Sequence, residues 1–226
     1  MDIHSHLLPG IDDGVKTIFQ SAYILEQFQE LGVQKVITTP HVMQDVWPNS
    51  STTIRQNLSE TKKTLGSLGI KHIDLDVGAE YMMDDLFYTL ISDNDIIPLY
   101  KEYILVEMST FNAPININEV LFEIKLKNYM PILAHPERYS FYHKNINLYK
   151  KLKDMGFLFQ LNLLSVSGYY GEKTQEIALK LITEDLIDFV GSDIHNYTHL
   201  DILKEGFPSK YAKKINVLMQ RNQVFL

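Results

Sequence analysis

The chain has no cysteine among its 226 residues. This absence excludes disulfide bonds, thiolate metal sites and any mechanism with a cysteine nucleophile. It is also typical of a reducing compartment. Any metal ion bound here must be held by imidazole and carboxylate groups, which are the ligands that hard and borderline divalent ions accept.

Long apolar runs and excess positive charge are missing too. No apolar stretch approaches the roughly 20 residues that span a bilayer, and residues 1–6 hold two histidines where a secretory signal would be basic and then apolar. The net charge is −7, so the chain has no basic footprint for nucleic acid. We expect a cytoplasmic protein without membrane insertion, in which residues 1–226 form one domain. A strand that starts at Met1 would leave room for a preceding segment.

Short apolar segments alternate with amphipathic ones along the chain. Gly32, Gly69 and Gly156 follow amphipathic segments, where a left-handed residue commonly ends a helix. The strands we predict are Met1–His6, Lys35–His41, Ile73–Met82, Tyr103–Met108, Met130–His135, Phe157–Leu163 and Asp188–Ile194. The helices we predict are Thr17–Leu31, Ser51–Leu68, Asp84–Ile91, Asn116–Lys127, Asn147–Asp154, Glu172–Thr183 and Ser209–Arg221. Repeated strand–helix units predict an α/β fold with a parallel sheet, most naturally a closed or distorted (β/α)7 TIM-like barrel.

Histidines and acids recur where these predicted strands end. His4 and His6 share one face of the first strand because side chains two apart in a strand point the same way. Asp193 and His195 repeat this arrangement near the other end of the chain, and single residues stand at or near the ends of strands between them: His41, Glu80, Glu107 and His135. The carboxyl ends of parallel strands meet at the catalytic face of such a fold, so these residues predict one metal cluster.

Glu107 stands in an apolar run, Leu105-Val106-Glu107-Met108, and a carboxylate buried there needs a cation. A buried ion pair is the alternative, although few lysines or arginines occupy strand interiors. Asp12 and Asp13 precede Gly14 in a predicted tight turn, where an acidic pair by itself would be ordinary turn chemistry.

Taken in order, these motifs resemble the polymerase and histidinol phosphatase (PHP) superfamily, and more narrowly the bacterial tyrosine phosphatases of capsule and exopolysaccharide biosynthesis. The resemblance covers nearly the whole chain and implies a distorted seven-stranded barrel. The segments that carry it are His4-x-His6, Asp12-Asp13-Gly14, Thr39-Pro40-His41, Gly78-Ala79-Glu80, Glu107, Ala134-His135-Pro136-Glu137-Arg138-Tyr139 and Gly191-Ser192-Asp193-Ile194-His195.

The resemblance implies a site with three metal ions. The ligands it implies are His4, His6, Glu80 and Asp193 for one ion, Glu80, Glu107 and His135 for a second, and Asp13, His41 and His195 for a third. Asp13 is preferred to Asp12 because the family's ligand stands next to the glycine. We expect manganese, with iron or zinc also compatible with mixed oxygen and imidazole ligands.

The implied reaction is hydrolysis of a phosphomonoester by a hydroxide that bridges the metals. Arg138, Asp193 and His195 are the residues expected to act in catalysis, with the planar guanidinium of Arg138 binding the phosphoryl oxygens. The alternative for Arg138 is a surface salt bridge with Glu137 or another acid.

Relatives of this kind often carry a second arginine soon after the Asp-x-His motif, but this chain continues Asn196-Tyr197-Thr198-His199-Leu200. His199 is a candidate substitute, although a lone loop histidine is expected to be exposed. His72 and His143 receive no role. Trp47, Tyr169 and Tyr170 lie in predicted rim loops, and each is expected to pack rather than to touch substrate.

The expected substrate is a phosphotyrosine protein, specifically the tyrosine-rich tail of a capsule-type tyrosine kinase. A small-molecule phosphatase, such as a histidinol phosphatase, would use the same metals on an alkyl phosphate. A metal-stabilised module without catalysis is the third alternative. The oligomeric state is left open.

Overall fold

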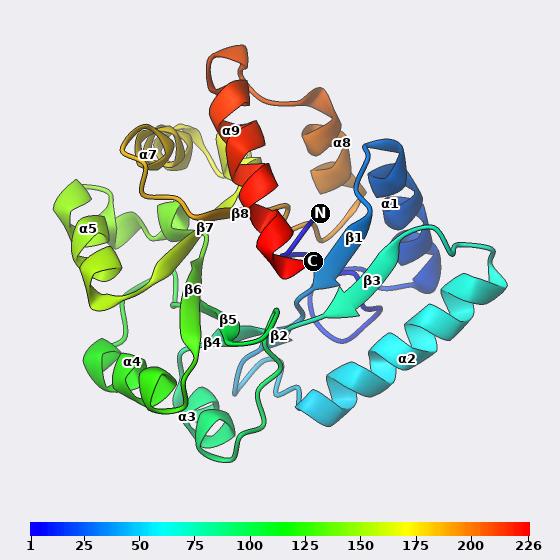
Figure 1. Cartoon of the computed structure of the whole chain (residues 1–226), viewed down its shortest axis with the longest axis horizontal. Coiled ribbons are helices and arrows are strands. Elements are labelled where there is room, and N and C mark those ends of the chain that lie inside the picture. Colours follow the sequence, from blue (N-terminus) through cyan, green and yellow to red (C-terminus); the bar gives the residue numbers. More distant parts are fainter.

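The computed structural model describes residues 1–226 and places short strands at the centre of a ring of helices (Figure 1). The strands are β1 Lys35–Thr38, β2 His41–Val42, β3 Asp74–Val77, β4 Glu80–Met82, β5 Tyr103–Glu107, β6 Met130–Ala134, β7 Leu158–Asn162 and β8 Phe189–Gly191. The helices are α1 Ile18–Glu30, α2 Ser51–Ser67, α3 Asp85–Ser92, α4 Ile117–Leu126, α5 Ile146–Met155, α6 Leu163–Val166, α7 Glu172–Thr183, α8 Tyr197–Glu205 and α9 Ser209–Arg221.

All paired strands run parallel, which confirms the α/β class. One sheet pairs β1 with β3, and the other has the order β2-β4-β5-β6-β7-β8. The predicted strand Lys35–His41 is divided into β1 and β2, because Pro40 has no N–H to donate to a neighbour. The predicted strand Ile73–Met82 is divided at Gly78, whose missing Cβ would lie 2.7 Å from the side chain of Leu99.

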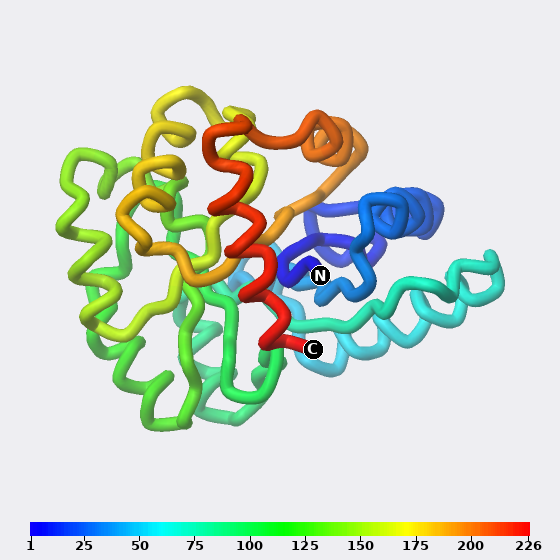
Figure 2. The backbone as a smooth tube through the Cα atoms, turned by 45° about the horizontal axis from the view of Figure 1, so that its top comes forward, coloured from blue at the N-terminus to red at the C-terminus, as the bar shows by residue number.

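The prediction of Met1–His6 as a regular strand is wrong, because this segment makes only isolated bridges. Asp2 bridges to Val36 on one side, and Ser5 bridges to Ile194 on the other, both in parallel. The segment therefore lies between the small sheet and the end of β8. Figure 2 shows the N-terminal segment passing through the middle of the molecule, near the C-terminus.

Each predicted helix is present within a residue or two at its ends, and Gly32, Gly69 and Gly156 all have the expected positive φ. Two helices were not predicted. Helix α6 is a single turn, too short to show periodicity. Helix α8 begins after Asn196, whose side chain accepts the N–H of His199 as an N-cap. None of the helices combines the length and apolar composition that crossing a membrane requires.

The main core lies between the six-stranded sheet and the helices that cover it, and it contains 34 buried apolar residues. The free edge of β8 is closed by polar side chains. Asn222, just after α9, accepts the N–H of Val190 at 3.2 Å and donates to its carbonyl oxygen at 2.7 Å. The Asp2 carboxylate accepts both the N–H and the hydroxyl of Ser192 at 2.8 Å. These bonds satisfy an edge that would otherwise be open to pairing with another chain.

Candidate active site

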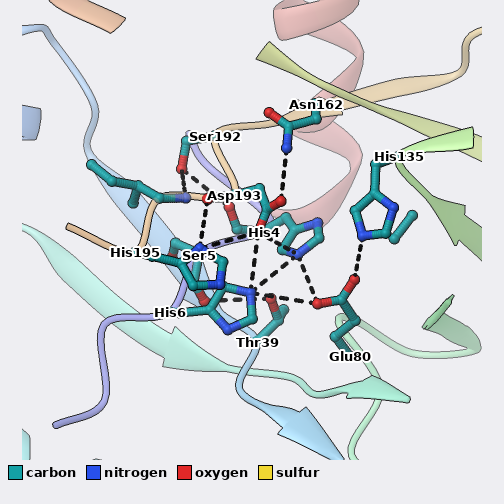
Figure 3. A network of polar contacts seen from close by, with 12 residues as sticks. His4, Ser5, His6, Thr39, Glu80, His135, Asn162, Ser192, Asp193 and His195 are labelled. Atoms are coloured by element: carbon teal, nitrogen blue, oxygen red, sulfur yellow. Dashed lines mark hydrogen bonds and ion pairs between the residues drawn. The ribbon is translucent and has the colours of Figure 1, made fainter. Parts of the chain in front are cut away.

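The histidines and acids predicted at strand ends converge at the carboxyl edge of the sheet. Figure 3 shows part of this set: His4, His6, Glu80, His135, Asp193 and His195. His4 and His6 come from the N-terminal segment, His135 directly follows β6, and Asp193 and His195 follow β8. Two positions differ from the sequence prediction, because His41 and Glu80 begin β2 and β4 instead of lying late in longer strands. The two short strands pair in register at these residues, which brings the imidazole and the carboxylate to one side.

One group consists of His4, His6, Glu80 and Asp193, all fully or almost fully buried. The Nε2 atom of His4 lies 3.1 Å from Glu80 Oε2 and 3.3 Å from Asp193 Oδ1. His6 Nε2 lies 3.2 Å from the same oxygen of Asp193. Two imidazoles and two carboxylates therefore face one point.

A second group is built around Glu80 and Glu107. His135 Nε2 lies 2.8 Å from Glu80 Oε1 and 3.8 Å from Glu107 Oε2. His41 also turns its Nδ1 atom to this group, 3.0 Å from Glu107 Oε1 and 3.2 Å from Glu80 Oε2. Glu80 thus presents one oxygen to each of two neighbouring groups.

The third group lies at the surface. Asp13 Oδ1 is 3.3 Å from Nε2 of His195 and 3.5 Å from Nε2 of His41, and His6 lies close enough to complete the set. Asp12 is turned away from this point and is buried. Its Oδ2 atom accepts a hydrogen bond from Nδ1 of His6 at 2.7 Å and from the backbone N–H of His41 at 3.1 Å.

Hydrogen bonds at Nδ1 set the tautomers of three histidines. Nδ1 of His4 donates to Gln160 Oε1 at 2.7 Å, and Gln160 is itself oriented because its amide donates to the carbonyl of Leu161. Nδ1 of His6 donates to Asp12, and Nδ1 of His195 donates to the carbonyl of Asp193 at 2.9 Å. Each imidazole therefore turns the lone pair of Nε2 towards the cluster, which is the arrangement that metal-ligating histidines use.

Two residues of the cluster have a strained backbone conformation. His135 has φ of 35° and Asp193 has φ of 49°, in the left-handed region that residues with a Cβ rarely occupy. Such conformations cost about 1–3 kcal/mol each and are found mostly at functional sites. The surrounding hydrogen bonds hold both side chains on the cluster despite this cost.

Charges within the cluster shift the pKa values of its members in opposite directions. Burial lowers the pKa of His41, but the carboxylates of Glu80 and Glu107 outweigh it and raise that pKa to about 9. Burial likewise opposes ionisation of Glu80 and Asp193, yet His4 and its neighbouring cations hold the pKa of both carboxyls well below the usual range. Glu80 and Asp193 are therefore ionised at neutral pH, and His41 holds a proton when no other cation is present.

The unpaired atoms of the cluster fit a metal ion. His41 Nδ1 and Glu107 Oε1 are sealed from solvent, lie 3.0 Å apart, and neither has a hydrogen-bond partner. A buried imidazole nitrogen and a buried carboxylate oxygen without partners are costly, and a divalent cation between them would satisfy both. The donor set is imidazole and oxygen throughout, as expected for a chain without thiolates.

A pocket of about 300 Å³ opens onto the cluster. It is lined by five of the ligand candidates, Asp13, His41, Glu107, Asp193 and His195, and by Arg138, Tyr169, Tyr170, Asn196 and His199. Nη1 of Arg138 donates to Asp193 Oδ2 at 3.0 Å, and its guanidinium lies 4.4 Å from the centre of the Tyr170 ring. Glu137 makes no pair with Arg138. It is buried and accepts hydrogen bonds from the N–H of Asn162 and the hydroxyl of Ser165.

The aromatic and histidine residues expected only to pack or to be exposed lie around this pocket. Tyr169 and Tyr170 line it directly. Trp47 stacks on the ring of His41, with centroids 5.2 Å apart. The expectation that His199 is exposed is wrong: only 6% of it is accessible, because α8 turns it inward against Tyr169.

Sequence reasoning missed the residues that hold the ligands in place: Asp12 as partner of His6, Gln160 as partner of His4, and Asn162, which donates to Asp193 Oδ2 at 2.7 Å. A signal was present for one of them. Gln160 interrupts the apolar strand Phe157-Leu158-Phe159-Gln160-Leu161, as Glu107 interrupts its own strand. A buried amide in a strand next to predicted ligands points to a supporting hydrogen bond.

A parallel α/β fold with a buried imidazole and carboxylate cluster at its carboxyl edge is the arrangement of metal-dependent hydrolases. This chain belongs to the CpsB/CapC family of capsular polysaccharide synthesis, whose family model matches residues 1–206. A Staphylococcus aureus relative named CapC is 30% identical over 94% of this chain and 84% of its own. The tyrosine-protein phosphatase YwqE of Bacillus subtilis is 30% identical over 87% of this chain and 77% of its own.

Solved structures agree with these relatives. The crystal structures of YwqE from Bacillus subtilis and CpsB from Streptococcus pneumoniae, described as metal-dependent tyrosine phosphatases, include a chain with a TM-score of 0.81 and 26% identity. That match covers 97% of this chain and 94% of the other. A lactonase from Listeria monocytogenes has a TM-score of 0.54 at 14% identity, which shows a shared fold.

Proposed function

We propose that this chain is a metal-dependent protein tyrosine phosphatase, which hydrolyses phosphotyrosine side chains to tyrosine and inorganic phosphate. The observation that carries this proposal is the position of Arg138. Its guanidinium faces the same pocket as the buried carboxylates and imidazoles, and it is fixed there by Asp193 and Tyr170. A phosphoryl group in this pocket would meet a planar set of N–H donors beside a cluster suited to cations.

In this proposal the metal ligands form three sets. His4, His6, Glu80 and Asp193 would hold one ion, Glu80, Glu107 and His135 a second, and Asp13, His41 and His195 a third. When bound, divalent ions at such sites polarise phosphoryl oxygens and lower the pKa of water to yield a nucleophile near neutral pH. Manganese is the proposed metal, and iron or zinc are the other ions that this donor set accepts.

The protein's own side chains bind the phosphoryl group and keep the metal-binding carboxylate of Asp193 in place. The free N–H groups of Arg138 bind phosphoryl oxygens, while its bond to Asp193 prevents the side chain from swinging into solvent. Asn162 donates to the same oxygen of Asp193 and keeps that carboxylate from rotating. The chain has no cysteine for a cysteinyl-phosphate route, and we propose water as the nucleophile.

A tyrosine leaving group suits this site. Phenol has a pKa of about 10, so it departs with less proton donation than an alkyl alcohol needs. The curated relatives named above as tyrosine phosphatases favour the same substrate over histidinol phosphate and over a non-catalytic module. We propose the phosphorylated tail of a capsule-type tyrosine kinase as the physiological partner and the cytoplasm as the location.

The fold that supports this chemistry is proposed to be one domain, residues 1–226, built as a distorted seven-stranded barrel. Hydrogen bonds between neighbouring strands continue across the breaks that separate β1 from β2 and β3 from β4. The backbone N–H of Gly78 donates to the carbonyl of Thr38 at 3.0 Å, and that of Glu80 donates to the carbonyl of Pro40 at 3.1 Å. On the other side, Asp193 donates to the carbonyl of His4 at 2.7 Å, which joins β8 to the N-terminal segment.

The proposal is tested by phosphate release from a phosphotyrosyl peptide and from histidinol phosphate, using protein loaded with Mn2+ after chelation. We expect turnover of the peptide that depends on metal and falls about 100-fold or more in Arg138→Ala, since removing one preorganised donor of this kind typically costs 100- to 1,000-fold. Arg55→Ala, which replaces an exposed arginine on α2, is the matched control. Turnover of histidinol phosphate alone, or full activity of Arg138→Ala, would overturn the proposal.

A further inference from the structure

We propose that His199 binds a phosphoryl oxygen of the substrate through its Nε2–H group and is therefore a further catalytic residue of this site. The inference rests on the proposed phosphatase function and adds a second donor to Arg138. It follows from the hydrogen bonding, the accessibility and the packing of one imidazole.

The proton position on His199 is set by the backbone. Its Nδ1 atom accepts the N–H of His195 at 3.3 Å, so this nitrogen carries a lone pair. A neutral imidazole whose Nδ1 accepts must carry its proton on Nε2. The ring therefore presents an N–H donor at its other end.

That donor is free and open. Nε2 of His199 makes no hydrogen bond within the protein, and it is not among the polar atoms that are sealed from solvent without a partner. The residue as a whole is only 6% exposed, and it lines the pocket that holds Arg138 and the metal-binding groups. The small exposed part of the side chain therefore includes a hydrogen-bond donor next to the site of reaction.

The ring is held in place before substrate binds. Its backbone N–H is bound by the Asn196 side chain at 3.0 Å in the first turn of α8. The ring of Tyr169 stands edge-on to it, with centroids 4.8 Å apart. A donor fixed in this way gives up little conformational entropy when it binds an anion, which is the property that makes preorganised donors effective.

The pocket offers few other side-chain donors to a phosphoryl group. Arg138 already uses Nη1 on Asp193, and one face of its guanidinium lies on Tyr170. The other charged side chains around the pocket are carboxylates and histidines of the proposed metal sets, which would bind cations. Among the lining groups, His199 is the imidazole whose second nitrogen is left for a substrate.

Two substitutions separate a donor from a structural role. In His199→Asn the shorter amide oxygen can still accept the His195 N–H, but the donor at the Nε2 position is lost. In His199→Gln the longer amide can place an N–H near the Nε2 position, but the bond to His195 is lost. His72→Asn, at an exposed position, is the matched control.

For metal-loaded protein acting on a phosphotyrosyl peptide, we expect His199→Asn to lose about 10- to 100-fold in kcat/KM, the range of one hydrogen bond to a charged group. Inhibition by inorganic phosphate should weaken about tenfold, while His199→Gln stays within about fivefold of wild type. Metal content should be unchanged in both. The loss should be the same for phenyl phosphate and p-nitrophenyl phosphate, because the donor acts on a phosphoryl oxygen and not on the leaving oxygen.

The reverse order, with His199→Gln impaired and His199→Asn active, would assign His199 to positioning His195 and overturn the proposal. A loss of metal in His199→Asn would do the same, as would a loss that grows with the pKa of the leaving group. If wild-type protein shows no phosphatase activity, the proposed function fails instead. Phosphate binding to the metal-loaded protein, measured by calorimetry, then still tests the donor, because His199→Asn should bind phosphate about tenfold more weakly.

Discussion

Replacement of Asp12 by asparagine tests whether the hydrogen bonds behind the metal ligands determine metal affinity. Asp12 contacts no substrate-facing surface, yet its carboxylate accepts three N–H groups: Nδ1 of His6, and the backbone N–H groups of His41 and Gly14. Burial would raise its pKa, but His6 and the other donors hold that pKa well below its usual range. The carboxylate is therefore ionised and acts purely as an acceptor.

An asparagine cannot reproduce this pattern. Two donors meet Oδ2 and the third meets Oδ1, so in either orientation the amide NH2 faces an N–H group. Unmaking a hydrogen bond to a buried charged group costs about 1.5–3 kcal/mol. For a domain of this size, about 2 kcal/mol lowers the melting temperature of the metal-free protein by about 4–8 °C. Loss of an orienting partner typically weakens metal binding 10- to 100-fold, or about 1.4–2.7 kcal/mol.

The assay is calorimetric titration of chelator-treated Asp12→Asn protein with Mn2+, together with thermal melting in the absence of metal. Asp45→Asn, in the exposed loop after β2, changes the same chemical group without these contacts and should match wild type in both measurements. Wild-type metal affinity in Asp12→Asn would refute the claim that His6 is oriented through Asp12.

Three further outcomes follow from the geometry. The pKa of His41 is raised to about 9 from an ordinary value of 6.5, so metal uptake displaces a proton, and apparent metal affinity should rise with pH and level off above about 9. The same proton stabilises the metal-free protein. Melting curves should show that this stabilisation is complete below pH 6.5 and is lost as pH rises through about 9. In Gly14→Ala the new Cβ would lie 2.3 Å from the backbone oxygen of His6, so about 3 kcal/mol or more should be lost in denaturant unfolding, whereas Gly66→Ala, in open space on α2, should gain about 0.5–1 kcal/mol. Asn222→Leu should cost about 2–4 kcal/mol in the same measurement, because it leaves the N–H and carbonyl of one β8 residue unpaired.

The sequence predicts the ligands well because they obey a local rule. Residues at the ends of parallel strands meet at one edge, and a buried acid such as Glu107 is conspicuous in an apolar run. The residues that hold the ligands in place follow no local rule. Whether Asp12 or Asp13 faces the cluster depends on a turn that places the two carboxylates on opposite sides of His6 and His41, and no spacing in the sequence encodes that choice.

The strand pattern was predicted less well for a physical reason. Apolar alternation continues through Thr39-Pro40 and through Gly78-Ala79, but hydrogen bonding there depends on a missing N–H and on a close approach to Leu99. Helix α8 has a readable N-cap at Asn196 and apolar residues at Leu200 and Leu203 on one side. Its three charged residues and short length obscure that pattern. The burial of His199, which depends on this helix, was therefore not predicted either.

The junction between the N-terminal segment and the end of β8 has a kinetic consequence. The bonds from Ser192 to Asp2 join residues 190 positions apart, and His4 meets Gln160 across 156 positions. Contacts of such long range form late, since the loop-closure entropy must be overcome before they contribute. During synthesis, the first two histidines must wait until Asp193 has emerged before their metal set exists. Metal ions would therefore stabilise the finished fold without helping it to form, and their main kinetic effect should be to slow unfolding.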